Sequence, residues 1–566
     1  MRLRRVTLGA ALAALVGCSG PPSPGAVGTT AAPLSSAPKT IVVGVLGVTP
    51  TFAPFDQSNP TGGLPGLTEM HVNGLVTNDP VGGLEARLAS KLPSLDDGSI
   101  AVLPDGRMRT VWPLRANVKW HDGTPFTAND LLFTWEVLQH PDTPSTSASK
   151  WVQLIDSMTA PDPLTLVVTW NSTYYGALDI GHRVIWPFPS HLLADLFSRD
   201  VEAFRNSPYW TTQWVHLGPF RLVEFGIDTL MFERFDDYFL GRPKIDRVLV
   251  RRIGDANTLV AHVSAGVIDM TSDGALPNDA VAKLREEWER SGIATIVNRP
   301  QSWHYHHFQM DPQWARPVEV SQDVRLRRGL FQAIDRQSLR EFLYPGLSDI
   351  GADSFLLPKD PRRRVTGEPF SRYPYDPAAA ARQLAEAGWL KGPDGRLADL
   401  RTQVVEIEIL AEERDARERA IVADSFRAMG IDARERTNSV IDNNEDRASF
   451  PGLASTGRTN GLGVFVYFHS RQNATLQNRW AGQNKNHYAN RTLDGLIDRL
   501  YETVDDREQV ALAKTMGDIL ADDLPLIPLY FRVSSAAVAR GVLALDDYAG
   551  GDSGTMPRNS HLWERA

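Results

Sequence analysis

The chain has 566 residues, of which 42% are hydrophobic and 22% are charged, and its formal net charge is −9 at pH 7. These values are ordinary for a globular protein with packed cores, and the length leaves room for roughly three to four domains. A negative charge spread along the chain argues against nucleic acid as a partner, and the single cysteine, Cys18, excludes an internal disulfide.

The first residues have the layout of a secretory signal. A basic start precedes an apolar run at 6–16, which is far shorter than the ~20 residues that span a bilayer. Residues 15–18, Leu-Val-Gly-Cys, fit the lipobox of bacterial lipoproteins, so we expect cleavage before Cys18 and lipidation of its thiol. An ordinary signal peptide with an incidental cysteine is the alternative, and the pair Arg4-Arg5 leaves twin-arginine export open beside the Sec route.

A spacer and the first strand come next. Residues 19–38 consist almost entirely of Pro, Ser, Gly, Ala and Thr, a composition that cannot bury enough apolar surface to fold. We therefore expect a flexible linker there. The β-branched run at 41–45 predicts the first strand.

The clearest local pattern lies between residues 104 and 140. It predicts, in order, a turn at 104–106, a strand at 108–114, a short strand at 118–120 and an Asp-Gly turn at 122–123. A helix should then begin at Thr127, with Asp130 as the acid at its third position, and end at His140.

The rest of the chain alternates between strands and helices. Further strands are predicted at 165–170, 220–222, 245–253, 404–410 and 526–531. Further helices are predicted at 255–266, 323–334, 337–342, 377–387, 414–429, 493–500 and 507–520. This alternation is typical of the α/β class.

The stretch 114–131, Leu-Arg-Ala-Asn-Val-Lys-Trp-His-Asp-Gly-Thr-Pro-Phe-Thr-Ala-Asn-Asp-Leu, closely resembles the signature of family 5 extracellular solute-binding proteins. These are the dipeptide, oligopeptide and nickel binders of ABC importers. Segments that resemble other motifs of the family follow in the same order, at 217–220, 237–246, 265–269, 323–336 and 524–530.

The resemblance implies a type II (cluster C) periplasmic-binding-protein fold, with two main lobes joined by a hinge and an extra inserted domain. After the signal at 1–18 and the linker at 19–38, lobe I would comprise 39–80, 185–265 and 495–566, lobe II would be the insert 81–184, and lobe III would be 266–494. The ligand would lie between lobes I and III. The signature would lie in lobe II, so Asp122 and Asp130 are interpreted as scaffold.

The resemblance also indicates where this chain departs from its family. In peptide-binding members an aspartate of lobe III holds the α-ammonium of the ligand. Asn460 aligns with that aspartate and Arg458 with a neighbouring tryptophan. An arginine repels an ammonium and can grip a carboxylate or phosphate instead. A shifted alignment, with Arg458 solvated, is the alternative.

Residues 303–309 align with the strand of lobe III that borders the ligand cleft, which makes Trp303 and Tyr305 candidate contacts. His304 and His306 would share one face of this strand. Because no carboxylate or cysteine clusters beside them in the sequence, we predict no metal site there.

Three more residues are candidate ligand contacts. Tyr467 could stack on a sugar or an apolar side chain, with core packing as the alternative. Thr51 and Phe52 follow the first strand, at a position where cleft contacts arise in the family.

These expectations describe a substrate-binding lipoprotein of an ABC-type importer that captures a peptide or peptide-like solute. We expect a monomer without a cofactor, held outside the cytoplasm on the cell membrane through Cys18, with permease and ATPase subunits as partners. A sensory ligand-binding lipoprotein and a binder of oligosaccharides or metal chelates are the alternatives. A secreted hydrolase is disfavoured, because the sequence has no Gly-x-Ser-x-Gly elbow, His-Glu-x-x-His or P-loop.

Overall fold

The computed structural model describes residues 38–566, with gaps at 48–50, 56–63, 65, 80–82, 144–148, 182–185, 277, 348, 439–443 and 544–555. The chain divides into two compact units, Met1–Pro38 and Lys39–Ala566, and every element below belongs to the second. Cys18, the lipobox and residues 19–37 of the linker lie outside the described residues.

Ten strands form one mixed sheet in the order β16-β15-β17-β12-β18-β11-β1-β10-β9-β8. They are β1 (Thr40–Leu46), β8 (Phe220–Phe225), β9 (Thr229–Arg234), β10 (Arg247–Ile253), β11 (Met270–Thr271), β12 (Ala294–Phe308), β15 (Glu406–Glu412), β16 (Asp432–Asn438), β17 (Leu453–Arg458) and β18 (Leu526–Ala539). The predicted strands at 41–45, 245–253 and 404–410 are thereby confirmed, and the strand predicted at 526–531 is longer than expected.

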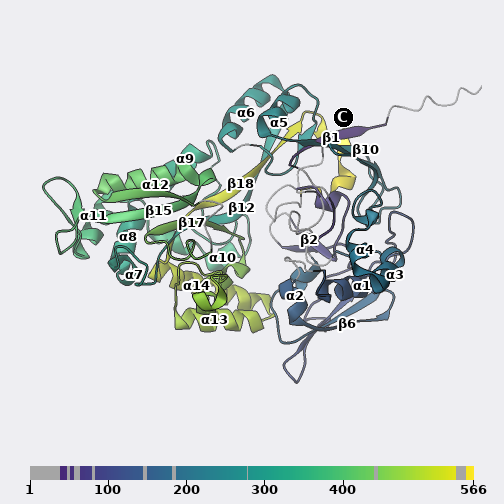
Figure 1. Ribbon diagram of the computed structural model, residues 1–566, viewed down its shortest axis with the longest axis horizontal. Helices are drawn as coiled ribbons and strands as arrows, with labels where there is room; N and C mark the ends of the chain where they lie inside the picture. Colours follow the sequence, from purple (N-terminus) through teal and green to yellow (C-terminus); the bar gives the residue numbers. More distant parts are fainter. Residues whose placement is uncertain are drawn as a thin grey trace, which may run out of the picture. The chain divides into compact units, whose positions relative to one another are not determined.

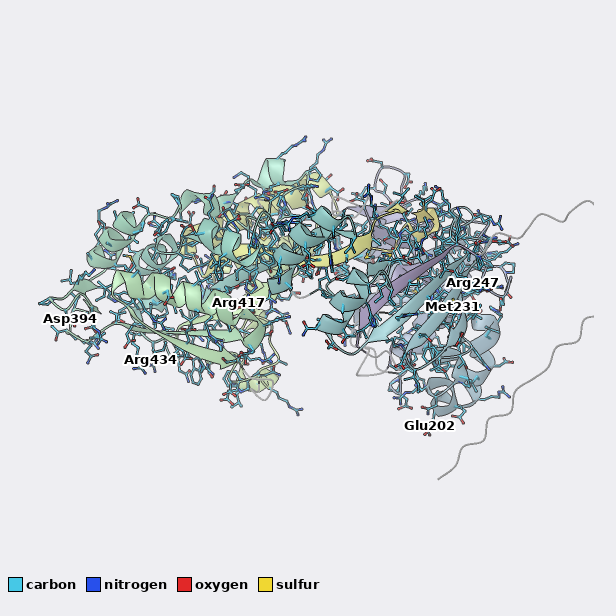
Figure 2. All side chains as sticks on the ribbon, turned by 90° about the horizontal axis from the view of Figure 1, so that it is seen from above. Glu202, Met231, Arg247, Asp394, Arg417 and Arg434 are labelled. Atoms are coloured by element: carbon cyan, nitrogen blue, oxygen red, sulfur yellow. The ribbon has the colours of Figure 1, made fainter. Side chains whose placement is uncertain are left out.

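Two long antiparallel strands connect two groups of shorter ones. β12 and β18 pair along most of their length, from Ala294 opposite Ala539 to His307 opposite Leu526, and Figure 1 draws them side by side. β18 borders the group β1, β8–β11 through β11, and β12 borders the group β15–β17 through β17. In Figure 2, Met231 and Arg247 mark the first group and Arg434 the second.

The pairing of β12 with β18 is interrupted in its middle. The register shifts between Pro300 and Trp303, and again between His304 and Tyr305. Proline has no backbone N–H to give to a ladder, and an unpaired residue bends and twists a strand. The connection between the two strand groups is therefore bent where β12 leaves one group and enters the other.

A separate four-stranded sheet, β4-β5-β7-β6, occupies the region predicted to be an insert. It contains β4 (Ile100–Val102), β5 (Met108–Pro113), β6 (Ile155–Asp162) and β7 (Thr165–Trp170). The strand predicted at 118–120 is wrong: Lys119 forms only an isolated bridge to Pro125. Since β5 already has β4 and β7 on its two edges, no edge beside it is left for another strand.

The helices are α1 (Ala128–Gln139), α2 (Ser149–Leu154), α3 (Ser190–Arg199), α4 (Val201–Arg205), α5 (Ala256–Ser264), α6 (Asn278–Ser291), α7 (Glu319–Gln322), α8 (Val324–Gln332), α9 (Arg336–Leu343), α10 (Arg363–Thr366), α11 (Pro377–Glu386), α12 (Ala416–Met429), α13 (Arg491–Glu502) and α14 (Asp506–Asp523). Two-stranded ladders join β2 (Val76–Asn78) to β3 (Leu84–Ala86), β13 (Leu390–Lys391) to β14 (Leu397–Ala398), and β19 (Val542–Leu543) to β20 (Glu564–Arg565). None of the helices in the described ranges combines the length and the apolar character that a bilayer crossing requires.

The predicted caps explain where several helices begin and end. Thr127 and Asp130 form the expected capping box of α1, with the Thr127 backbone N–H donating to Asp130 at 2.9 Å. Asp376 accepts from the backbone of Ala379 at 2.8 Å and caps α11. Gly430 takes the left-handed conformation that ends α12, with φ of 95°.

The apolar core around β12 and β15 also includes residues of α13 and α14, such as Ile497 and Met516. A second core surrounds β1, β9 and β10, and a third surrounds the four-stranded sheet. The three-lobe division stays a prediction. The packing of α13 and α14 concerns the predicted boundary between lobe III and lobe I at residues 494 and 495. Residues of 495–523, which were assigned to lobe I, share a core with residues assigned to lobe III.

Three histidines lie buried where the second and third cores meet. His71 Nδ1 accepts a hydrogen bond from Trp214 Nε1 at 3.0 Å, and His121 Nδ1 accepts from the His216 backbone at 3.2 Å. Burial lowers the pKa of His71 to about 3, helped by the nearby His121, and it lowers the pKa of His121 to about 4. Burial also holds the pKa of His216 well below its usual value. These imidazoles are therefore neutral in the folded protein at neutral pH.

Candidate functional site

A cavity of about 1110 Å³ opens beside the ends of β15, β16 and β17. β15 runs parallel to both β16 and β17, and their last residues, Glu412, Asn438 and Arg458, all line the cavity. In open α/β sheets, ligand sites form outside the carboxyl ends of parallel strands. The cavity is therefore the candidate binding site.

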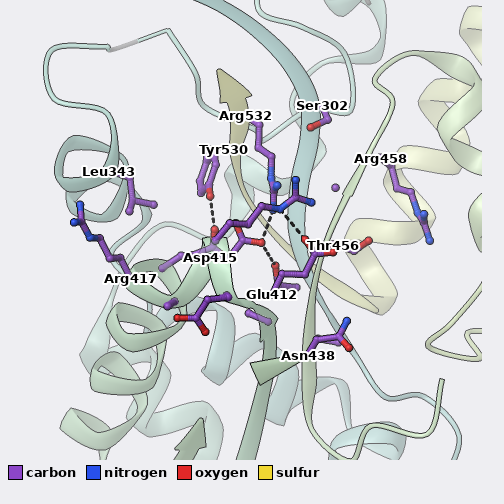
Figure 3. A pocket seen from close by; sticks show the side chains of 18 of the residues that line it. Ser302, Leu343, Glu412, Asp415, Arg417, Asn438, Thr456, Arg458, Tyr530 and Arg532 are labelled. Carbon is purple, nitrogen blue, oxygen red and sulfur yellow. Dashed lines mark hydrogen bonds and ion pairs between the residues drawn. The ribbon is translucent and has the colours of Figure 1, made fainter. Parts of the chain in front are cut away.

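Side chains from four further elements complete its wall, as Figure 3 shows. A short 3₁₀ turn, Glu413–Asp415, joins β15 to α12 and brings Asp415 and Glu418 to the start of that helix. Leu343 comes from the end of α9, and β18 contributes Tyr530 and Arg532. Ala481, Gln483 and Lys485 come from the loop before α13.

Arg532 is held from two sides at the wall of the cavity (Figure 3). Its Nη2 pairs with Asp415 at 2.5 Å, and its Nε donates to His304 Nδ1 at 3.0 Å. Burial acts to lower the pKa of Arg532, but Asp415 together with Tyr530, Glu418 and Tyr344 outweighs burial, and the pKa is raised. The guanidinium is thus a fixed cation whose charge is balanced by Asp415.

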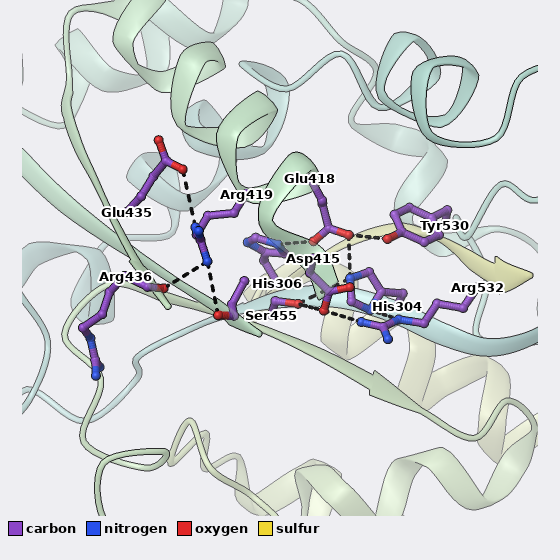
Figure 4. Close-up of polar contacts among 11 residues, drawn as sticks. His304, His306, Asp415, Glu418, Arg419, Glu435, Arg436, Ser455, Tyr530 and Arg532 are labelled. Atoms are coloured by element: carbon purple, nitrogen blue, oxygen red, sulfur yellow. Dashed lines mark hydrogen bonds and ion pairs between the residues drawn. The ribbon is translucent and has the colours of Figure 1, made fainter. Parts of the chain in front are cut away.

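Glu418 is the centre of the buried polar network in Figure 4. His304 Nε2 lies 2.7 Å and His306 Nε2 2.5 Å from its carboxylate, and the Tyr530 hydroxyl also donates to it. Burial acts to raise the pKa of Glu418, but the two imidazoles lower it well below its usual range. Glu418 is therefore an ionised buried carboxylate with donors around it.

The hydrogen bonds of His304 fix its tautomer. Its Nδ1 accepts from Arg532, so the ring proton lies on Nε2 and is donated to Glu418. Burial lowers the pKa of His304, which agrees with a neutral ring. A metal ion on Nε2 would require Nδ1 to carry the proton and to face the N–H of Arg532. The arrangement therefore favours a hydrogen-bonded network over a metal centre.

The surroundings of these histidines differ from the prediction. No carboxylate was expected beside His304 and His306, yet Glu418 comes within hydrogen-bond distance of both from a helix more than a hundred residues away in the chain. Among the described residues, these three form a group whose possible ligand atoms lie within 4.8 Å of one another. These three residues could hold a metal ion by their geometry. The tautomer of His304 argues against a metal ion at this place.

Three cations on the other wall have no acidic partner. Arg447, Arg458 and Lys485 line the cavity, and within the described part of the chain no carboxylate lies within ion-pair distance of them. Arg458 stacks over the Tyr467 ring at 4.6 Å and donates to the Gln483 carbonyl at 3.1 Å. Burial, together with Arg458 and Arg447, lowers the pKa of Lys485 to about 8. This wall carries uncompensated positive charge.

The candidate contacts named from the sequence lie at different distances from this cavity. Arg458 lines it, Tyr467 lies under Arg458, and Asn460 donates to the backbone of Gln301, which is also a lining residue. Trp303 and Tyr305 are 0% and 2% exposed and pack in the first core.

The two candidates after the first strand lie in the second core. Phe52 is 1% exposed and stacks on Trp214 with 4.7 Å between ring centroids. Thr51 donates to the Trp210 carbonyl at 3.1 Å. A contact of either residue with ligand stays a prediction.

Sequence reasoning missed Asp415, Glu418, Arg532 and Lys485. A signal for the first two was present, because the run Glu412–Arg419 is densely charged, begins just after a predicted strand and continues into the first turns of a predicted helix. Such a junction is the carboxyl end of a strand, where α/β proteins bind ligands. Arg532 had no comparable signal, since it follows an apolar strand and its partners come from distant segments.

The sequence resembles known proteins over most of its length. A family profile described as bacterial extracellular solute-binding proteins, family 5 Middle, matches residues 99–451. A putative ABC transporter peptide-binding protein of Brucella ovis is 26% identical over 283 residues, which is 49% of this chain and 48% of that protein. The chain thus aligns with about half the length of the curated relatives it matches.

Solved structures share the fold. NikZ from Campylobacter jejuni, in complex with Ni(L-His), superposes with a TM-score of 0.66 at 20% identity and covers 94% of this chain and 100% of that one. An oligopeptide-binding protein from Thermus thermophilus, complexed with a pentapeptide, has a TM-score of 0.64 at 21% identity over 93% of this chain and 96% of that one. The predicted type II α/β fold is confirmed.

Proposed function

We propose, from the premise that the chain belongs to the bacterial extracellular solute-binding proteins of family 5, that it captures a peptide or peptide-like solute and delivers it to the permease of an ABC importer. The solute would occupy the cavity at the ends of β15, β16 and β17. The relative from Brucella ovis carries the name of an ABC transporter peptide-binding protein, and the similar structure from Thermus thermophilus holds a pentapeptide. Both names support the proposal.

The cavity is the observation that carries this proposal. Its volume of about 1110 Å³ slightly exceeds the ~300–1,000 Å³ typical of small-molecule sites, so it has room for a short peptide. Its walls combine an apolar side chain, Leu343, with charged and hydrogen-bonding groups such as Thr456 and Asn438. A peptide offers the same mixture of apolar side chains and amide groups.

A thermal-shift screen tests the proposal. Ligands that bind the folded state raise the melting temperature by mass action. We expect short peptides, or blocked and modified peptides, to raise the melting temperature of the purified protein and to be recovered unchanged. A screen in which oligosaccharides alone stabilise the protein would contradict it, and steady conversion of any stabilising compound would revive the hydrolase alternative.

A metal chelate is the second candidate, because one observation favours it. His307 lines the cavity, and burial together with Arg458 holds its pKa well below the usual value, so its imidazole is neutral and suited to a metal. NikZ, which is similar in structure, was solved with Ni(L-His). Nickel–histidine therefore belongs in the same screen.

The cellular setting is part of the proposal. The protein would be a monomer, held outside the cytoplasm by lipid on Cys18 and presenting the solute to permease and ATPase subunits. Substitution Cys18→Ala should move the protein from the membrane fraction to the soluble fraction. Loss of uptake of the stabilising solute on gene deletion would support transport, and intact uptake with a lost response to the solute would support sensing.

A further inference from the structure

The cavity divides into a wall whose charges are balanced and a wall whose charges are not. On the first wall, Asp415 pairs with Arg532 at 2.5 Å, and Glu412 pairs with Arg414 at 2.7 Å. The carboxylate of Glu418 contacts the imidazoles of His304 and His306. These three acids are therefore paired inside the protein. Glu413 also lines the cavity, but its side chain is exposed to solvent, which screens its charge from the cations on the second wall.

Arg458 is already oriented for a ligand. Stacking on Tyr467 and the hydrogen bond to Gln483 hold its guanidinium plane in place. Its Nε–H is buried and has no acceptor among the described residues. A buried donor without a partner is unfavourable, and an oxygen pair that accepts from this edge would remove that penalty.

Lys485 supports the same conclusion from a second direction. Its Nζ donates to the Trp480 carbonyl at 2.5 Å. Because a carbonyl is neutral, this hydrogen bond gives the ammonium no counter-charge. Its lowered pKa is partly caused by the repulsion from Arg458 and Arg447. An anion between these cations would relieve the repulsion.

The loop that carries Lys485 is held in an unfavourable conformation. Arg479, Trp480 and His487 have φ of 53°, 60° and 57°, in the left-handed region that bulky side chains rarely adopt. Backbone strain of this kind is often found at ligand-binding segments. The loop brings Ala481, Gln483 and Lys485 to the cavity.

We propose that the solute presents an anionic group, a carboxylate or a phosphate, to Arg447, Arg458 and Lys485, and that a peptide with a free ammonium at this place is rejected. This inference rests on the proposed function, because it names the class of peptide-like solute that the same cavity takes. Arg458 grips two oxygens from its stacked position, and Lys485 and Arg447 complete the charge. The balanced wall around Arg532 contacts neutral parts of the solute.

Four pools of random-sequence tripeptides test the inference in a thermal-shift assay on the purified protein. The pools have a free amine with a C-terminal amide, two blocked ends, a blocked amine with a free acid, and blocked ends with one phosphoserine. We expect the third or the fourth pool to stabilise the protein most, and the comparison of these two tells carboxylate from phosphate.

The variant Arg458→Gln should weaken the binding of the preferred anionic pool by about tenfold to a hundredfold, which is the range for losing a charge-assisted hydrogen bond. Arg382→Gln is the control, because Arg382 is an exposed cation on α11 that does not line the cavity. It should change binding less than threefold. Equal losses in both variants would overturn the assignment to Arg458.

The number of protons taken up on binding tests whether Lys485 contacts the anion, because a purely structural role of Lys485 would not change that number. An anion beside Lys485 raises the pKa of its ammonium, so binding near pH 8 should take up protons, measured by calorimetry in two buffers of different ionisation enthalpy. Lys485→Met should abolish this uptake. Preference for the free-amine pool, unchanged in Arg458→Gln, would overturn the inference and leave the proposed function standing. If no peptide pool binds, the proposed function fails and the inference falls with it.

Discussion

Acid should destabilise this protein through its buried histidines, and His71 allows the size of the effect to be calculated. In the folded state its pKa is about 3, against an ordinary value of 6.5. Between these two pH values the imidazole is protonated in the unfolded chain and neutral in the folded protein. Stability is therefore fully present above pH 6.5 and is lost as the pH falls toward the folded pKa. Between about pH 7 and about pH 5, linkage gives a loss of about 2 kcal/mol in the free energy of unfolding for this one group.

The surroundings of His71 explain why it resists protonation. Its ring packs between Phe52 and Phe232, and its Nδ1 already accepts from Trp214. The titratable groups nearest to it, His121 and His216, are also neutral and provide no negative charge that would stabilise an imidazolium. His121, with a pKa of about 4, adds a further loss of about 2 kcal/mol over the same interval.

Urea unfolding at a series of pH values measures this loss, and His71→Asn isolates the contribution of one residue. The amide oxygen of asparagine can replace Nδ1 as the acceptor for Trp214 but cannot take up a proton in this range. We expect the variant to be less stable at neutral pH, and its loss between about pH 7 and about pH 5 to be about 2 kcal/mol smaller than that of the wild type. Gln139→Asn, at the exposed end of α1, is the control, because it changes no titratable group and should leave the slope unchanged. An unchanged slope in His71→Asn would refute the reasoning.

Three other predictions concern the polar network and the packing near the cavity. Glu418→Gln replaces one acceptor of three donated hydrogen bonds by an amide N–H, so it should lower the free energy of unfolding by about 1–3 kcal/mol, while exposed Glu413→Gln should change it by less than about 0.5 kcal/mol. Zinc should not raise the melting temperature through the group His304, His306 and Glu418, and a rise that disappears in His304→Asn would disprove the assigned tautomer. Gly452→Ala should destabilise the pairing of β15 and β17 by about 1–3 kcal/mol or more, because a Cβ at residue 452 would lie 2.2 Å from the Glu408 carbonyl oxygen. Gly495→Ala, inside α13 with open space around its Cβ, is the control and should stabilise the protein by roughly 0.5–1 kcal/mol.

Local rules were enough to predict most of the helices and strands. Thr127 with Asp130, Asp376 with its proline, and Gly430 mark ends of helices, because capping depends on residues a few positions apart. The strand at 118–120 failed because strand formation needs a neighbour, and the sequence alone does not show that β5 has no free edge.

The candidate site was harder to predict because its parts meet only in the folded chain. Arg458 was found through the family resemblance and Tyr467 as a candidate contact, but the neighbouring Lys485 belongs to a loop with no regular periodicity. The network around Glu418 joins β12, α12 and β18, whose residues are separated by more than a hundred positions. Hydrophobic patterns report which side of an element is buried, and they do not report which buried polar groups become partners.

The two walls of the cavity have different energetic roles, and the difference follows from how their charges are balanced. Around Glu418 and Arg532 each charge is hydrogen-bonded inside the protein, so this wall keeps its shape whether or not a solute is present. The opposite wall holds three cations that repel one another in the free protein, and the pKa of Lys485 is lowered by burial and, in addition, by Arg458 and Arg447. A solute gains binding energy mainly where such unfavourable terms can be removed. Selectivity among peptide-like solutes should therefore depend on the unbalanced wall, although the balanced wall contains more of the charged groups.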